Sequence, residues 1–306
     1  MSLTRLSYSA YSLYNNCPKQ FKIKYIDKIK IPSINIYNVG GTSMHNTIQE
    51  FLTVGFKEGF DKADQIEWVN KFLEYYTIEI KKAKETYVKL GMDINEILNP
   101  KSLTEFYEDC VAIINFIMKN RRQYFDKDEY DLIGIEMPIN VLLSQHEENS
   151  VRFIGFIDVV FKSKKQENSY LVIDLKLSTR KWDTNPEQSK KDQLLLYKKF
   201  ISDRYNCPMD NVEVKYVIMK RKIYEPSADK KAENKFIATE KRIQEIKIAQ
   251  SERTVNKSYQ GFINFFNDVL ENSTWKEGKT YPAFPSKSSC RFCPYKNTEH
   301  CSEGID

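Results

Sequence analysis

The sequence predicts an α/β protein that carries a helical insertion ahead of its sheet. Within residues 46–130, apolar residues recur three and four positions apart, which is the spacing of amphipathic helices. The pattern then changes to short runs rich in branched residues and separated by polar turns, as in strands. The chain has 306 residues, of which 41% are hydrophobic, enough to bury a sizeable core. We expect a single domain over residues 1–306.

The first expected element is a helix with a mixed aromatic face at residues 7–25, SYSAYSLYNNCPKQFKIKY. Either Ser7 or Ser9 can cap it, because a serine hydroxyl accepts a hydrogen bond from a free N–H of the first turn.

A second helix is expected in NVGGTSMHNTIQEFL, residues 38–52. The two glycines indicate a turn, so this helix should start near Thr42 or Ser43. Helical spacing then continues through the insertion, where GMDINEILNP at 91–100 separates two helical stretches.

The sheet is expected in a catalytic core at residues 131–222. Three strands are expected to meander, and a fourth follows a helix at 186–205. The four runs are DLIGIEMPINVLL at 131–143, VRFIGFIDVVFKSK at 151–164, SYLVIDLKLSTR at 169–180 and VEVKYVIMKRK at 212–222. Residues 225–252 are charged and helical or loop-like. In the C-terminal segment 255–306, NKSYQGFINFFNDVLEN places its apolar residues on one stripe, which predicts a helix packed on the core.

Two acids and a lysine stand out on the central strands. Asp174 and Lys176 are two residues apart, so they project from the same face of their strand. The turn before them has the right length to bring Asp158 alongside. Two carboxylates on a half-buried strand are costly unless a cation compensates them, and Mg²⁺ or Mn²⁺ suits oxygen ligands. The alternative is a surface salt bridge between Asp174 and Lys176, with Asp158 incidental.

GFID followed by VIDLK resembles the core of PD-(D/E)xK nucleases, and specifically their RecB-like branch. The resemblance implies a restriction-endonuclease-like fold, in which helices flank a mixed central sheet. It also implies that Asp158 and Asp174 bind the catalytic metal and that Lys176 positions the attacking water.

Further motifs of the branch occur in the same order. GTSMHNTIQEF resembles its early helix, which makes His45 a metal ligand, and QLLLY resembles its Q-x-x-x-Y helix, which makes Gln193 and Tyr197 catalytic residues that orient the substrate strand. Glu136, in IGIEMPI, corresponds to an acidic residue that supports the metal site in relatives. Taken singly, each residue has an alternative interpretation: His45 as a capping or packing residue, Tyr197 as a core residue and Glu136 as a solvated strand residue.

Three of the six cysteines fall in a C-x₂-C-x₇-C pattern near the C-terminus, at Cys290, Cys293 and Cys301. The resemblance extends to members such as the AddB nuclease domains and the CRISPR-associated adaptation nucleases, and implies that Cys17 joins these three in holding a 4Fe-4S cluster. Thiolate-only coordination suits such a cluster. A structural zinc is the alternative, with His300 as an alternate ligand.

The expected function is that of a metal-dependent DNA exonuclease acting on single strands or linear ends. The resemblance implies work in recombination, repair, or phage or CRISPR DNA processing, with recombination, helicase or CRISPR proteins as partners and a phage as one origin. The net charge of +5 is compatible with DNA but does not require it. The alternative is a DNA-end-binding recombination partner that uses a nuclease fold for binding only.

The composition also bears on location. No run approaches the roughly 18 uninterrupted apolar residues that a membrane helix requires. The first residues lack the long apolar stretch of a signal peptide. We therefore expect a cytoplasmic protein of a bacterial, archaeal or phage-infected cell, with no membrane partner.

Overall fold

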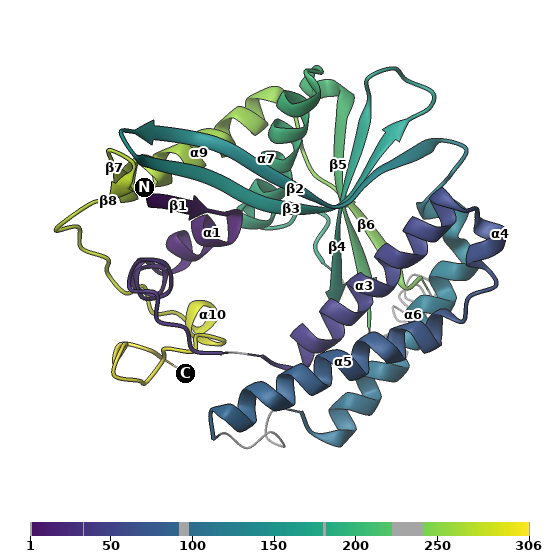
Figure 1. Ribbon diagram of the computed structural model, residues 1–306, viewed down its shortest axis with the longest axis horizontal. Coiled ribbons are helices and arrows are strands. Elements are labelled where there is room, and N and C mark those ends of the chain that lie inside the picture. The colour runs from purple at the N-terminus through teal and green to yellow at the C-terminus, as the bar shows by residue number, and fades with distance from the viewer. Residues whose placement is uncertain (1, 33, 92–97, 180–181, 222–240, 306) are drawn as a thin grey trace, which may run out of the picture.

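A mixed six-stranded sheet crosses the molecule, with helices on both of its faces (Figure 1). The structure is a computed structural model, and it describes residues 2–32, 34–91, 98–179, 182–221 and 241–305. The observed order of helices, meandering strands, helix and strand confirms the predicted α/β class. None of the described helices is both long and apolar enough to cross a membrane.

The sheet has the order β1-β3-β4-β5-β6, and β2 pairs with β3 as well. The strands are β1 (Ser2–Leu6), β2 (Tyr130–His146), β3 (Asn149–Ser163), β4 (Tyr170–Ser178), β5 (Val212–Lys220) and β6 (Ile243–Lys247). The pairs β2–β3, β3–β4 and β5–β6 are antiparallel, whereas β1–β3 and β4–β5 are parallel. The parallel pair β4–β5 is joined through the predicted helix α7 (Gln188–Tyr205), as a crossover connection requires.

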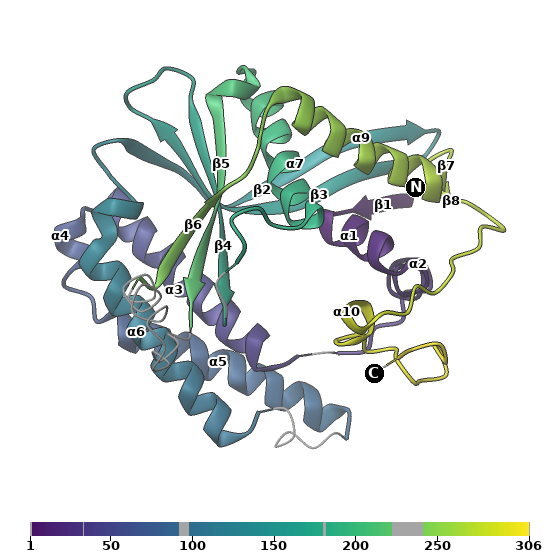
Figure 2. The same cartoon turned by 180° about the vertical axis from the view of Figure 1, so that it is seen from behind.

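The helices form two groups, one on each face of the sheet. Figures 1 and 2 show the molecule from opposite sides. The group that follows the first turns of the chain comprises α3 (Ile36–Lys57), α4 (Phe60–Ala63), α5 (Trp68–Lys89) and α6 (Pro100–Tyr124). The other elements are α1 (Tyr8–Asn16), α2 (Pro18–Phe21), a π-helix (Lys22–Ile26), a 3₁₀ turn (Met209–Asn211), α9 (Glu252–Val269), the short strands β7 (Leu270–Glu271) and β8 (Thr274–Trp275), and α10 (Lys287–Cys290).

Two hydrophobic cores lie on the two faces of the sheet. Residues Val160 and Val172 of the central strands pack with α1, α7 and α9. Their neighbours Val159 and Ile173 point the other way and pack with α3, α5 and α6. This alternation explains why the strands carry continuous branched runs rather than alternating polar residues, because both faces of the sheet are covered.

The helix predicted in residues 38–52 is present, but the turn predicted at its two glycines is wrong, because the whole stretch lies inside α3. The helix starts at Ile36, where the side chain of Asn35 accepts hydrogen bonds from the N–H groups of Tyr37 and Asn38 in a capping box. Gly40 serves packing instead of turning. A Cβ atom added there would lie 2.5 Å from the ring of Phe106 on α6.

The first predicted helix is confirmed at its start and divided later. Ser7 caps α1 and accepts a hydrogen bond from the N–H of Ala10. The helix ends at Asn16, and Pro18 begins α2 because proline is tolerated at the first helical position. Of the charged segment predicted at 225–252, the part up to residue 240 lies outside the described residues, and the later part contains β6.

One edge of β3 is shared by two strands. β1 pairs with Asn149–Phe153, and β4 pairs with Val159–Lys162. The residues between these ladders, 154–158, have no strand partner on that edge within the described part of the sheet. The strands therefore part beside Asp158, and this divergence gives side chains from other elements access to the sheet.

Candidate active site

Three carboxylates lie in a row across β2, β3 and β4. Glu136 is located between two β2 residues whose partners flank Asp158 on β3, so the two acids face each other. The β3–β4 ladder ends at Val159 and Ile173, and one further step places Asp158 opposite Asp174. Like charges directly opposite on neighbouring strands destabilise a sheet. The row is therefore the electrostatic pattern of a cation site.

The carboxylate of Asp158 is fixed at the point where the strands diverge. Its Oδ2 accepts a hydrogen bond of 2.7 Å from the backbone N–H of Leu175, in place of a regular ladder bond. Burial raises the pKa of Asp158 to about 6, although the nearby ammonium of Lys176 opposes the shift. This carboxylate is therefore fixed in position and partly desolvated.

His45 reaches this carboxylate from α3. Its Nδ1 lies 3.7 Å from Asp158 Oδ2, and ligand atoms of His45, Glu136 and Asp158 all lie within 4.8 Å of one another. Burial, and then the charge of Lys176, lower the pKa of His45, so the ring is neutral at pH 7 and its lone pair is available to a metal. The helix that was expected to start only after the glycines therefore begins earlier, and it carries the predicted histidine.

Glu136 is held by a residue that motif comparison did not identify. Gln49 donates a hydrogen bond of 2.6 Å from Nε2 to Glu136 Oε1. Gln49 follows His45 by four residues, so both lie on one face of α3, and this spacing is the signal that could have indicated it. Glu136 itself adopts φ = 45°, the left-handed region that non-glycine residues rarely occupy.

Asp174 and Lys176 form an ion pair at the edge of this group. Asp174 is only 2% exposed, so the alternative of a surface salt bridge is wrong. Burial raises the pKa of Asp174 to about 6 against the opposing charge of Lys176. Burial would lower the pKa of Lys176, but the charges of Asp174 and Asp158 outweigh it and raise that pKa, so the ammonium stays protonated.

Gln193 and Tyr197 lie one turn apart on α7, as predicted from their spacing. Gln193 Nε2 donates to the hydroxyl of Tyr197 at 3.1 Å, and the hydroxyl of Tyr216 lies 3.4 Å from Gln193 Oε1. Tyr197 is 5% exposed and belongs to the core on that face. Burial raises the pKa of Tyr197, and the negative charge of Asp174 is the next cause that raises it.

These side chains fit a divalent cation. Carboxylate oxygens and a neutral imidazole are suitable donors, and the pKa values of both aspartates are raised because their negative charge is buried. An open hollow gives access to the site, and it is lined by Tyr37, Asn38, Gly41, Thr42, His45, Asn46, Glu136, Lys176 and Leu177.

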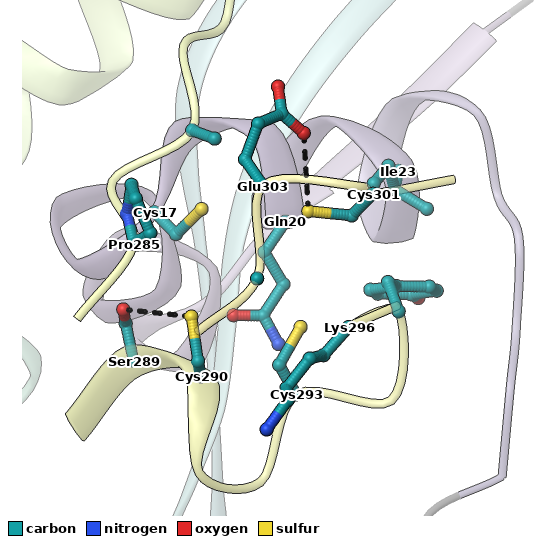
Figure 3. Close-up of a pocket in the computed structure, with 13 residues that line it drawn as sticks. Cys17, Gln20, Ile23, Pro285, Ser289, Cys290, Cys293, Lys296, Cys301 and Glu303 are labelled. Carbon is teal, nitrogen blue, oxygen red and sulfur yellow. Dashed lines mark hydrogen bonds between the residues drawn. The ribbon is translucent and has the colours of Figure 1, made fainter. Parts of the chain in front are cut away.

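A separate pocket is lined by four cysteines. Cys17 lies between α1 and α2, Cys290 ends α10, and Cys293 and Cys301 follow in the C-terminal loop. Figure 3 shows the four sulfur atoms directed toward a common centre. Four thiols from two distant segments around one pocket fit a metal ion or an iron–sulfur cluster.

Other contacts hold the two segments of the cysteine pocket together. The backbone N–H of Lys19 donates to the carbonyl of Pro282 at 3.1 Å, and the Lys19 ammonium contacts Glu303 at 2.6 Å. The hydroxyl of Tyr295 donates to the carbonyl of Ile29 at 2.6 Å. The two segments that line the pocket are therefore also joined by contacts that do not involve the cysteines.

Comparison with known proteins agrees with this site. The sequence model of the PD-(D/E)XK nuclease superfamily matches residues 5–298, and the chain belongs to this superfamily. Its members are nucleases that use divalent metals, and the mixed sheet flanked by helices is consistent with their restriction-endonuclease-like fold.

No curated protein matches the chain. A solved structure described as "Crystal structure of SSO0001" matches with 12% identity and a TM-score of 0.34 over 96% of each chain.

Proposed function

We propose that the protein is a metal-dependent DNA nuclease of the RecB-like branch that acts as an exonuclease on single strands or linear ends. The observation that supports this most strongly is the convergence of His45, Glu136 and Asp158 within 4.8 Å, beside the buried pair Asp174–Lys176. A purely structural cluster would not gather three acids in a row across a sheet without a compensating cation.

Each residue has a defined task in this proposal. His45, Asp158 and Asp174 hold the divalent ion, and Glu136, oriented by Gln49, completes its surroundings. When bound, the ion supplies Lewis-acid stabilisation of charge on the phosphoryl oxygens. Lys176 remains protonated between the two aspartates, where its N–H groups can orient a water molecule and balance negative charge on a phosphate.

We assign Gln193 and Tyr197 to positioning of the substrate strand. Gln193 is half-buried and its amide is fixed by two tyrosine hydroxyls, so it is the member of the pair that can reach a nucleotide. Tyr197 is buried and acts through Gln193.

The cysteine pocket is proposed to hold a 4Fe-4S cluster. Its ligands are Cys17, Cys290, Cys293 and Cys301, and its task is to join the C-terminal loop to the start of the chain. The proposal rests on the thiolate-only donor set and on the family resemblance, and a tetrahedral zinc ion is the competing occupant.

The function is tested by degradation of labelled linear DNA with Mn²⁺ or Mg²⁺. The wild-type protein should degrade single strands from an end and should leave closed circles intact. Lys176→Ala should lower kcat by about 100-fold or more, because it removes a group that acts on the reacting atoms. Lys257→Ala, an exposed lysine on α9, serves as the matched control and should retain full activity.

The possible outcomes separate the two functional hypotheses. Unchanged degradation by Lys176→Ala would remove this residue from the mechanism. Cleavage of closed circles would contradict the exonuclease assignment. Binding of DNA ends without degradation in either metal would instead establish the DNA-end-binding recombination partner. We propose, on the family resemblance, that the protein works in recombination, repair, or phage or CRISPR DNA processing.

A further inference from the structure

A groove connects the candidate active site with the cysteine loop. The hollow at the active site adjoins a second hollow, and the two share Tyr37, Asn38 and Leu177 as lining residues. The second hollow is also lined by Asn35, Ser178, Thr179, Arg291 and Phe292. The first turns of α3 and the end of β4 therefore form a continuous path from Lys176 to the C-terminal loop.

The far end of the groove carries a cation and an aromatic ring from one short loop. Arg291 and Phe292 are the two residues between Cys290 and Cys293. Phe292 is 64% exposed, which is unusual for a large apolar side chain, and the Arg291 guanidinium lies 5.1 Å from the centre of its ring. The cysteine pocket thus fixes both ends of a loop that presents these side chains.

The groove has the chemistry of a site for unpaired nucleotides. Tyr37, which is 55% exposed, and Phe292 offer two aromatic faces from different segments. Amide and hydroxyl groups line the path between them. Sites for single strands combine aromatic rings that stack on unpaired bases with positive charge that follows the phosphate backbone.

We propose that this groove binds a single-stranded nucleic acid whose scissile phosphate lies at Lys176, with Phe292 stacking on a base and Arg291 contacting a backbone phosphate. The inference rests on the proposed nuclease function and specifies its substrate as a single strand several nucleotides long. It also gives the cysteine pocket a function, because the loop between Cys290 and Cys293 becomes part of the substrate site.

The test compares substrates that do and do not reach the loop. Wild type, Phe292→Ala, Arg291→Ala and the double variant are assayed on a dinucleotide and on single-stranded oligonucleotides of increasing length. Phe292→Ala should raise KM for the long strands by about 5- to 100-fold, the range of one lost stacking contact. The dinucleotide should be cleaved at an unchanged rate, because it does not extend to the loop.

Two further readouts identify the contacts. Arg291→Ala should lower the dependence of log Kd on log salt by about 0.7, as expected for one phosphate contact on a single strand. A strand that carries 2-aminopurine should lose its stacking-induced fluorescence change in Phe292→Ala. Phe284→Ala, an exposed phenylalanine outside the lining of the groove, and Arg253→Ala on α9 serve as matched controls.

The outcomes distinguish this inference from the proposed function. Metal content is measured in every variant, so that loss of the cysteine-bound group is not mistaken for loss of a contact. If wild type cleaves long strands and both variants keep its KM, the groove assignment is overturned while the nuclease function stands. Tighter binding of blunt duplexes than of single strands would also overturn it. If wild type cleaves neither substrate, the proposed function itself fails.

Discussion

At the scale of single residues, the site is a balance between buried negative charge and the groups that offset it. Asp158 accepts one hydrogen bond from Leu175 and lies near the ammonium of Lys176. These two groups do not offset the cost of burying its negative charge. The folded state therefore raises the pKa of Asp158 from 3.8 to about 6. A raised carboxyl pKa lowers the stability of the metal-free protein as pH rises from about 3.8 to about 6, and the loss is complete above that window.

Asp158→Asn should remove this penalty. In the presence of a chelator at pH 8, its free energy of unfolding should exceed that of wild type by up to about 3 kcal/mol, and the difference should vanish near pH 4. Urea unfolding followed by circular dichroism measures both values. Asp61→Asn, an exposed aspartate on α4, should change stability by no more than about 0.5 kcal/mol at either pH. A variant no more stable than wild type at pH 8 would contradict the electrostatic interpretation.

The residues of the site were predictable to different degrees. That Asp174 and Lys176 share a face was predicted from the alternation of side chains along a strand. That Asp158 lies beside them was predicted from the length of the turn between the two strands. The role of Gln49 was not predicted from the sequence, because its partner, Glu136, is 87 residues away. The left-handed backbone of Glu136 also could not be predicted, because nothing in IGIEMPI favours a positive φ at a glutamate.

At the scale of secondary-structure elements, the sequence predicted the long helices and central strands and missed the short edge strands. β1 and β6 have only five residues each, too few to show a period. The sequence predicts a turn at the adjacent glycines of α3, whereas both lie inside the helix. Their role depends on α6, a distant element, because Gly40 allows the ring of Phe106 to approach the α3 backbone.

The two glycines should respond in opposite ways to alanine. Gly40→Ala should destabilise the protein by about 1–3 kcal/mol, because Phe106 is 2% exposed and has no room to move. Gly41→Ala meets no atom within 4 Å and should stabilise α3 by about 0.5–1 kcal/mol. Chemical denaturation of both variants checks the signs. Equal effects would show that α3 and α6 do not pack closely at this point.

At the scale of the whole molecule, the segment that follows β1 and the C-terminal loop meet at the cysteine pocket. The spacing of Cys290, Cys293 and Cys301 indicated a metal site from sequence alone, but it left the pairing with Cys17 to the family resemblance. The structure lines one pocket with all four, and the nature of the bound group stays a prediction.

Anaerobically purified protein should be brown and should contain about four irons and four sulfides per chain, as a 4Fe-4S cluster requires. Cys17→Ser should lose this iron and show a lower Tm, because the two segments lose their shared ligand group. Cys207→Ala, which removes a buried thiol outside the pocket, should keep its iron. A colourless protein with one zinc per chain would decide in favour of the alternative occupant.

The pairing of β1 with β3 has a consequence for folding during synthesis on the ribosome. Thr4 pairs with Val151, so residues 2–6 leave the exit tunnel about 150 residues ahead of the strand that receives them. At about 5–20 residues per second, they wait roughly 7–30 seconds with their backbone groups unpaired. The β2–β3 hairpin, whose partners are close in sequence, can form first and then serve as the template on which β1 docks.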